Sequence, residues 1–206
     1  QKKAAYAQTS GRLALEIVPV ELVKPKKESI WFSDDEFIKP NSTMDGLSKL
    51  RAAFRTAGGT VTAGNASGLN DGSAALLVAS ESCVKRHDLK PICRIVSSAV
   101  VGVEPKIMGI GPVEASQKAL RKAGLTINQM DIIEINEAFA VQVLSCLKAM
   151  NIPFDDPRIN PNGGGIALGH PLGMTGTRIL LSAALELQLK NKKFALVTMC
   201  IGVGQG

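Results

Sequence analysis

The chain contains few aromatic residues and few histidines. Phe, Trp and Tyr make up 4% of its 206 residues, and only two histidines occur. Proteins that bind single-stranded nucleic acid stack bases on aromatic side chains, so this composition argues against a nucleic-acid partner. The net charge of +6 is moderate and suits a phosphorylated small molecule better than a polynucleotide.

Features of membrane-spanning, secreted and zinc-binding proteins are also missing. No run of about 18 uninterrupted apolar residues occurs, and the opening QKKAAYAQTSGR has no apolar signal-peptide core. The four cysteines form no CxxC pair and have no histidine at zinc-like spacing. We therefore predict no membrane span, no metal site and no secretion, with a bacterial cytoplasm or an organelle matrix as the alternative compartments.

The sequence does contain the composition of a globular protein. Hydrophobic residues make up 45% of the chain and charged residues 20%, with a mean hydropathy of +0.13. Such a chain can bury a core in one large domain or two small ones.

A glycine-rich stretch at residues 163–176 (GGGIALGHPLGMTG) surrounds His170 and precedes a helical pattern. Glycine lacks a Cβ and accepts a positive φ, so this stretch can bring backbone very close to a ligand. A histidine placed there can titrate near neutral pH. The alternative is a tight strand-to-helix turn whose histidine caps a neighbouring carbonyl.

The order of apolar and amphipathic patterns predicts an α/β fold with a largely parallel sheet and helices against its faces. The expected strands cover residues 15–23 with an interruption at Pro19, 74–79, 92–103, 132–135 and 194–199. The expected helices cover part of 1–12, a short run capped by Ser80, the run from Pro112 to Gly124, 140–147 and 179–189. Residues 24–44, which include a lysine cluster at 24–27, are predicted to form a surface excursion.

Active sites in such sheets lie beyond the carboxyl ends of the strands. Asn136 follows one expected strand, Cys200 follows another, and His170 lies in the loop between them. We therefore expect these three side chains to converge on one pocket.

Three segments occur in the order found in the thiolase family: NEAFA at 136–140, the stretch 163–176, and CIGVGQG at 200–206. A fourth, TVTAGNASGLNDG at 60–72, precedes them. The chain resembles the C-terminal half of a thiolase subunit, which cleaves 3-oxoacyl-CoA or condenses two acetyl-CoA units. Details such as INQMDIIEINEAF look closest to the degradative branch, including 3-oxoadipyl-CoA thiolases, and a biosynthetic acetoacetyl-CoA thiolase is the alternative.

This resemblance implies a layered α/β architecture, mainly the C-terminal βαβ half with its sheet flanked by helices. It divides the chain into the end of a covering loop domain (1–63), a strand-helix piece of the N-terminal half (64–89), and a C-terminal half without its final strand (90–206). The family's acyl-accepting cysteine belongs to the amino-terminal half, to which nothing here corresponds. We therefore expect a fragment that is inactive alone and a full-length subunit that forms homodimers or homotetramers.

The resemblance also implies a role for each converging residue. His170 would activate the nucleophilic thiol, Cys200 would move the proton at the substrate's α-carbon, and Asn136 would orient a water at the enolate oxygen. The backbone N–H of Gly202 would serve the acyl-enzyme oxyanion, and Glu137 would support the loop. A thiol that shuttles protons needs a lowered pKa, which we expect the N–H-rich turn at 202–206 to provide.

Coenzyme A enters as a substrate, and no cofactor is expected. By resemblance, six residues contact it: Ser67 and Ala63 at the pantetheine arm, Leu50 near the adenine, Ala138 and Phe139 in the tunnel, and Lys39 near the nucleotide. Burial statistics alone would favour simple core positions for Leu50, Ala63 and Phe139. Gly46 departs from the serine of many biosynthetic relatives, which removes one expected contact.

A catalytically silent thiolase-like module that binds CoA or carries lipid is the alternative function. The joint presence of His170, Cys200 and Asn136 argues against it. A third possibility is that the chain binds nothing alone because half of the pocket is absent, which predicts exposed apolar surface.

Overall fold

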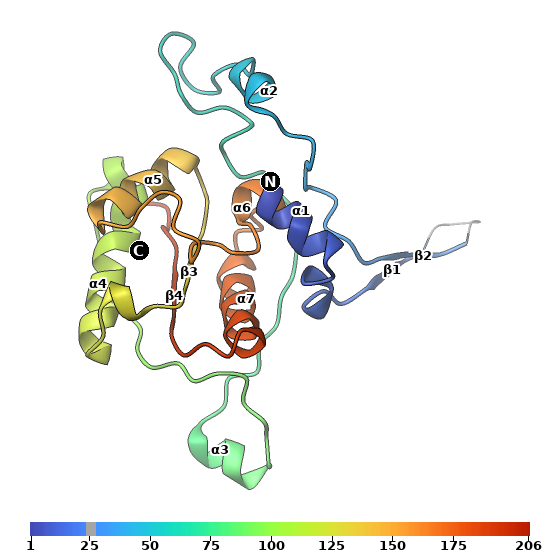
Figure 1. The fold of residues 1–206 in the computed structure, drawn as a ribbon, viewed down its shortest axis with the longest axis vertical. Coiled ribbons are helices and arrows are strands. Elements are labelled where there is room, and N and C mark those ends of the chain that lie inside the picture. Colours follow the sequence, from blue (N-terminus) through green and yellow to red (C-terminus); the bar gives the residue numbers. More distant parts are fainter. Residues whose placement is uncertain (24–27) are drawn as a thin grey trace.

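The structure is a computed structural model that describes residues 1–23 and 28–206, so the predicted lysine cluster at 24–27 lies outside the described residues. Its centre is a parallel pair of strands, β3 (Ile132–Ile135) and β4 (Ala195–Thr198). Helices α4 (Gly111–Ala123) and α5 (Ala140–Ala149) lie on one side of this pair, and α7 (Thr175–Leu189) lies on the other (Figure 1). This arrangement is the predicted layered α/β class.

The side chains of β3 divide between two environments. Ile133 and Ile135 are at most 1% exposed and belong to the main core, together with Val143 and Leu147 of α5. Since side chains alternate along a strand, Glu134 lies on the opposite face, where α7 packs. The strand is therefore buried on both faces.

The helices around the core begin and end near the predicted residues. Helix α4 has Pro112 in its first turn and ends at Gly124, whose φ of +65° is the left-handed conformation of a helix cap. Helix α5 buries Cys146 completely, so this thiol is part of the core. Helix α7 begins at Thr175, four residues before the predicted start at Ile179, so it follows His170 almost directly.

The first fifty residues form small elements around this body. They comprise helix α1 (Lys2–Thr9), the 3-10 turn η1 (Leu13–Leu15), the antiparallel hairpin of β1 (Val20–Leu22) and β2 (Ile30–Phe32), and α2 (Met44–Ser48). The predicted strand at 15–23 starts only after Pro19, because proline cannot donate to a ladder hydrogen bond. The hairpin projects away from the body (Figure 1), and all six of its strand residues are exposed.

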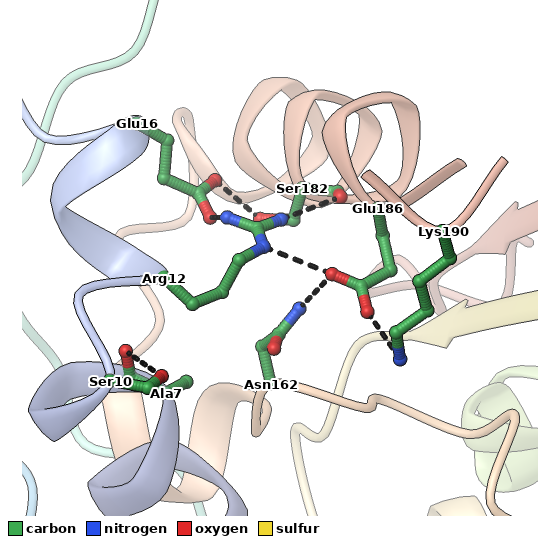
Figure 2. A network of polar contacts seen from close by, with 8 residues as sticks. All are labelled: Ala7, Ser10, Arg12, Glu16, Asn162, Ser182, Glu186 and Lys190. Atoms are coloured by element: carbon green, nitrogen blue, oxygen red, sulfur yellow. Dashed lines mark hydrogen bonds and ion pairs between the residues drawn. The ribbon is translucent and has the colours of Figure 1, made fainter. Parts of the chain in front are cut away.

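A buried polar network attaches this first segment to α7 (Figure 2). The guanidinium of Arg12 donates to Glu16 at 2.8 Å, to Glu186 at 2.9 Å and to the carbonyl of Ser182 at 3.1 Å. Asn162 and Lys190 complete the coordination of the Glu186 carboxylate. Because every charge in the network has a partner, the desolvation of these groups is offset and the segment docks in one orientation.

Two predicted strands are wrong. Residues 74–79 and 92–103 form no strand within the described chain, apart from a single bridge at Gly102, and most of their side chains are exposed. They flank the short helix α3 (Glu81–Arg86), where Ser80 caps the N–H of Cys83 as predicted. A strand needs a neighbour for its backbone hydrogen bonds, and the described residues provide none for 74–79 and only residues 204–206 for the end of the second run.

The remaining elements connect these parts. They are the 3-10 turns η2 (Pro105–Ile110) and η3 (Ile127–Gln129) and the one-turn helix α6 (Gly165–Leu168). Within the described residues, no helix has the length and apolar character needed to cross a bilayer.

The chain exposes more surface than a compact protein of its size. Its accessible surface is 13274 Å², whereas the scaling law for folded monomers gives roughly 9,200 Å² for this mass. Large exposed side chains include Leu77, Val78, Ile95 and Val100 in the two runs that form no strand. The predicted exposed apolar surface is therefore present.

Candidate active site

Asn136 lies at the carboxyl end of the parallel strand pair. It follows β3 directly, its backbone N–H donates to the carbonyl of Thr198 at the end of β4, and its side chain is 1% exposed. Cys200 comes two residues after Thr198 and is 6% exposed. The two strands therefore deliver an amide and a thiol to the same buried edge.

The loop that carries His170 is pressed against the segment at 68–70. The backbone N–H of His170 donates to the carbonyl of Gly68, and the side chain of Asn70 occupies the space beside Gly169. A Cβ at Gly169 would lie 2.4 Å from the Asn70 amide oxygen, and its φ is +92°. Only glycine fits both conditions, which is the close backbone approach that the glycine-rich sequence predicts.

His170 and Asn136 are in direct contact. The Asn136 Nδ2 atom lies 3.2 Å from His170 Nε2, and the other ring nitrogen, Nδ1, lies 2.7 Å from the hydroxyl of Thr175. The Thr175 hydroxyl has one proton, which it donates to the carbonyl of Pro171 at 2.9 Å. It must therefore accept from His170 Nδ1–H, so in neutral His170 the lone pair is on Nε2.

The charge state of His170 suits a base. Burial lowers its pKa, and the nearby positive charge of Arg178 lowers it further. The imidazole is therefore neutral at pH 7, and its Nε2 lone pair, which accepts from the Asn136 amide, is the position that can take a proton from a thiol.

Replacing Thr175 by valine is expected to lower kcat of the intact gene product roughly tenfold, because Nδ1–H loses its acceptor and the tautomer is no longer fixed. Thr175→Ser keeps the hydroxyl and should retain most activity. Thr177→Val makes the same replacement two residues away in α7. Steady-state kinetics and the imidazole ¹⁵N shifts measure the effect, and an unchanged Nε2 resonance in Thr175→Val would contradict it.

Burial raises the pKa of the Cys200 thiol, and the hydrogen bond from its own backbone N–H lowers it only in part. The expected lowering by the turn at 202–206 is therefore wrong for this chain. The reason is that the thiol lies in a buried position, where desolvation disfavours the thiolate more than the backbone hydrogen bond favours it. Cys200 is a protonated thiol at neutral pH.

Gly202 lies in the tight turn that follows β4. Ile201 and Gln205 exchange two backbone hydrogen bonds across this turn, at 2.9 and 3.2 Å. The chain then pairs antiparallel with residues 101–103, since Val101 and Gly206 also exchange two bonds. No contact of Gly202 with the His170–Asn136 pair is recorded among the described residues, so its proposed role rests on its place in the turn.

Three of the expected CoA residues come together beside Asn136. The backbone N–H of Ser67 donates to the carbonyl of Ala138 at 3.0 Å, and the Ser67 hydroxyl donates to the same oxygen at 3.3 Å. A bridge between Ala66 and Phe139 continues this pairing. The sequence segment at 60–72 is therefore joined to NEAFA by backbone hydrogen bonds.

The other three expected CoA residues border the same strip. The side chain of Leu50 covers Gly64, the neighbour of Ala63. Lys39 is exposed and its ammonium lies 4.4 Å from the centre of the Phe37 ring, which in turn packs on Gly68. Leu50 is 41% exposed, so the alternative of a simple core position does not describe it.

A large hollow in the described residues does not lie at the His170–Asn136 pair. This cavity of about 1010 Å³ lies between residues 92–100, β4 and the faces of α4 and α7. Helix α4 contributes Ala115, Ala119 and Ala123 to its wall. Aliphatic side chains such as Ile95, Ile179 and Leu196 form much of the remaining lining.

Sequence reasoning missed three buried polar residues around this site, Glu134, Asn160 and Thr175, and the half-buried Arg178. Among the described residues, the buried Oε1 atom of Glu134 and Nη2 atom of Arg178 have no hydrogen-bond partner. Spacing alone could have suggested Thr175, which lies five residues after His170 at the start of a helical pattern. Within the described residues, no cluster of three His, Cys, Asp or Glu side chains could hold a metal ion.

Two family models match this sequence in succession. The model "Thiolase, N-terminal domain" matches residues 1–82, and "Thiolase, C-terminal domain" matches residues 89–206. The chain belongs to the thiolase family. The residues between the two matched regions, 83–88, include most of α3.

Curated thiolases match over the whole chain. It is 53% identical over 206 residues to a 3-oxoadipyl-CoA/3-oxo-5,6-dehydrosuberyl-CoA thiolase of Escherichia coli, covering 51% of that protein. It is 48% identical to a beta-ketoadipyl-CoA thiolase of Acinetobacter baylyi, again covering 51% of it. The chain thus spans about half the length of the curated relatives that it matches.

Solved thiolase structures share the fold. The acetyl-CoA acetyltransferase of Bacillus anthracis superposes with a TM-score of 0.94 at 44% identity, covering 99% of this chain and 51% of that one. Human mitochondrial 3-ketoacyl-CoA thiolase in complex with CoA gives a TM-score of 0.92 at 44% identity, with 99% and 50% covered. These values confirm the thiolase-like layered α/β fold predicted from the motifs.

Proposed function

We propose that these residues belong to an acyl-CoA C-acetyltransferase that cleaves a 3-oxoacyl-CoA to acetyl-CoA and a shortened acyl-CoA. The observation that carries the proposal is the 3.2 Å contact between Asn136 and His170 at the carboxyl edge of β3 and β4, where Cys200 also lies. The family membership and the names of the relatives support the same reaction.

The first chemical step uses the imidazole. A cysteine from the amino-terminal half of the subunit attacks the 3-oxo carbon, and His170 Nε2 takes the thiol proton. The tautomer fixed by Thr175 leaves Nε2 without a proton, as this step requires. The bond between C2 and C3 then breaks, which leaves an acyl-cysteine and the enolate of acetyl-CoA.

Cys200 acts on the enolate. In the cleavage direction the carbon that leaves must gain a proton, and a buried protonated thiol can donate it. Asn136 would hold a water that, with His170, stabilises the enolate oxygen, and the N–H of Gly202 would serve the acyl-cysteine oxyanion. CoA then attacks the acyl-cysteine, so that the shortened acyl-CoA leaves and the cysteine is regenerated.

CoA would lie along the strip bordered by the six expected residues. Ser67, Ala63, Ala138 and Phe139 would contact the pantetheine arm and its tunnel, while Leu50 and Lys39 would lie toward the nucleotide. The pairing of 65–67 with 138–140 supports this placement, because it holds the strip directly beside Asn136. The exposed ammonium of Lys39 is free to meet a phosphate.

The cavity beside β4 supports the proposed domain division. The turn at 201–205 reverses the chain, and Gly206 lines the cavity while it pairs with Val101. A strand continuing from Gly206 would run antiparallel to β4 and to residues 92–100 and would pair with both. Residues 90–206 would then be a C-terminal half without its last strand, 64–89 a piece of the N-terminal half and 1–63 the end of a covering loop domain, in a subunit that forms homodimers or homotetramers.

The test is thiolysis by the intact gene product. With a 3-oxoacyl-CoA and free CoA, we expect acetyl-CoA and the shortened acyl-CoA to appear in equal amounts, measured by chromatography. Calorimetry with CoA alone is the companion experiment. Binding of CoA without turnover of any 3-oxoacyl-CoA would overturn the proposal and favour the catalytically silent module.

A further inference from the structure

Asn160 supplies the side chain that holds the end of β3. It is 2% exposed, and its φ of +41° is a left-handed conformation that asparagine tolerates. Its amide accepts from the N–H of Ile135 and donates to the carbonyl of Ile135, both at 2.9 Å. The same Nδ2 atom donates to Glu137 Oε1 at 2.7 Å. One side chain therefore binds the residues on both sides of Asn136.

Glu137 extends this contact to the loop that carries His170. Its second oxygen, Oε2, accepts from the N–H of Ile166 at 3.2 Å, in the single turn of α6. The carboxylate fills the space beside Gly164, where an added Cβ would lie 2.3 Å from its carbon. The two halves of the candidate site, the NEAFA segment and the glycine-rich stretch, are thus joined through one carboxylate.

This geometry bears on the contact between Asn136 and His170. Asn136 has a fixed residue on each side, and His170 lies four residues beyond the N–H that Glu137 holds. The donors to Glu137 that the structure records are an amide and a backbone N–H, so its charge is coordinated without a cation. A change at either partner would shift the two loops relative to one another.

We propose that Asn160 and Glu137 form a positioning pair that sets the Asn136–His170 distance and thereby the rate of turnover. The inference rests on the proposed thiolase function. Neither residue touches the reacting atoms, so the pair acts on kcat and leaves the KM for the CoA thioester nearly unchanged.

A reciprocal exchange tests the pair in the intact gene product. Asn160→Asp places two carboxylates at the 2.7 Å contact, and kcat should fall about 30-fold and recover partly toward acidic pH as the pair takes up a proton. In the double variant, Glu137→Gln with Asn160→Asp, the new amide donates to the new carboxylate. The donation to the carbonyl of Ile135 stays lost, so we expect kcat to recover at least about fivefold over Asn160→Asp without reaching that of wild type.

Asn151→Asp is the matched control, since Asn151 also has a positive φ, of +56°, but is an exposed residue just after α5. A double variant no better than Asn160→Asp, or a KM that rises in step with the loss of kcat, would overturn the proposal. The imidazole ¹⁵N shifts of His170 give a readout that needs no activity. An inactive wild type would count against the thiolase function alone, whereas His170 shifts unchanged in Asn160→Asp would count against the pair.

Discussion

Replacing His170 with alanine is expected to lower kcat for thiolysis by the intact gene product about a thousandfold, the usual size of a lost general base. The nucleophilic thiol then has no acceptor for its proton at neutral pH. CoA affinity should stay within about twofold, because His170 is 8% exposed and lies off the strip expected to bind CoA. Steady-state kinetics and calorimetry separate the two effects.

The chain offers its own control, because its other histidine lies far from the reaction. His87 ends the short helix α3 and is exposed, so His87→Ala should retain wild-type turnover. The pH profile adds a second criterion. Because burial lowers the pKa of His170, wild-type activity should stay high below the usual titration range of histidine. Near-normal turnover in His170→Ala would remove the basis of the proposed reaction.

The second large effect concerns stability. Glu134 is 1% exposed, its Oε1 atom has no hydrogen-bond partner in the part of the chain that the structure describes, and burial raises its pKa to about 8, although the charge of Arg178 opposes the rise. An unfolded glutamate titrates near 4.5. The folded state therefore holds a proton that the unfolded state releases between these values, so stability is fully present below pH 4.5 and is lost as pH rises through about 8.

Glu134→Gln should remove this dependence, because the amide stays neutral at every pH. Above pH 8 the variant is expected to be more stable than wild type by up to roughly 5 kcal/mol, the linkage value of the full shift. Urea unfolding followed by circular dichroism across the pH range measures the difference. A wild type whose unfolding free energy stays level through this range would contradict the prediction.

Glu186→Gln is a control of opposite sign on the facing helix. Burial pushes the pKa of Glu186 upward, but hydrogen bonds from Lys190, Asn162 and Arg12 outweigh this and lower it. The ionised carboxylate is therefore the stabilising form, and its removal should destabilise the protein near neutral pH. If Glu186→Gln were more stable than wild type, hydrogen-bond partners would not explain the opposite pKa shifts of Glu134 and Glu186.

The helices and strands that were predicted correctly were recognised from local sequence patterns. Gly124 marked the end of α4, and the run at 132–135 gave β3, because a cap and a doubly buried strand leave direct traces in the sequence. The run at 74–79 has the same apolar character but forms no strand. The two runs differ because β3 has a neighbouring strand for its backbone hydrogen bonds, and the run at 74–79 has none among the described residues. Pairing between distant segments cannot be predicted from local composition.

The candidate site was predictable to a similar degree. Motif order located Asn136 and His170, whose contact the structure shows. The roles of the Thr175 hydroxyl and the Asn160 amide were not predicted, because each acts through hydrogen bonds that exist only in the folded chain. The direction of the Cys200 pKa shift was mistaken for the same reason, because desolvation depends on what covers the thiol rather than on the glycines that follow it.

The bond from the Asn136 N–H to Thr198 has a consequence for synthesis on the ribosome. The two strands that meet there are separated by α5, α6 and α7, so their pairing closes a long loop and comes late in folding. A nascent polypeptide shorter than about 200 residues of this sequence has no β4 to complete the edge. The site would therefore be complete only near the end of translation of this region. Shorter nascent chains would not act on thioesters.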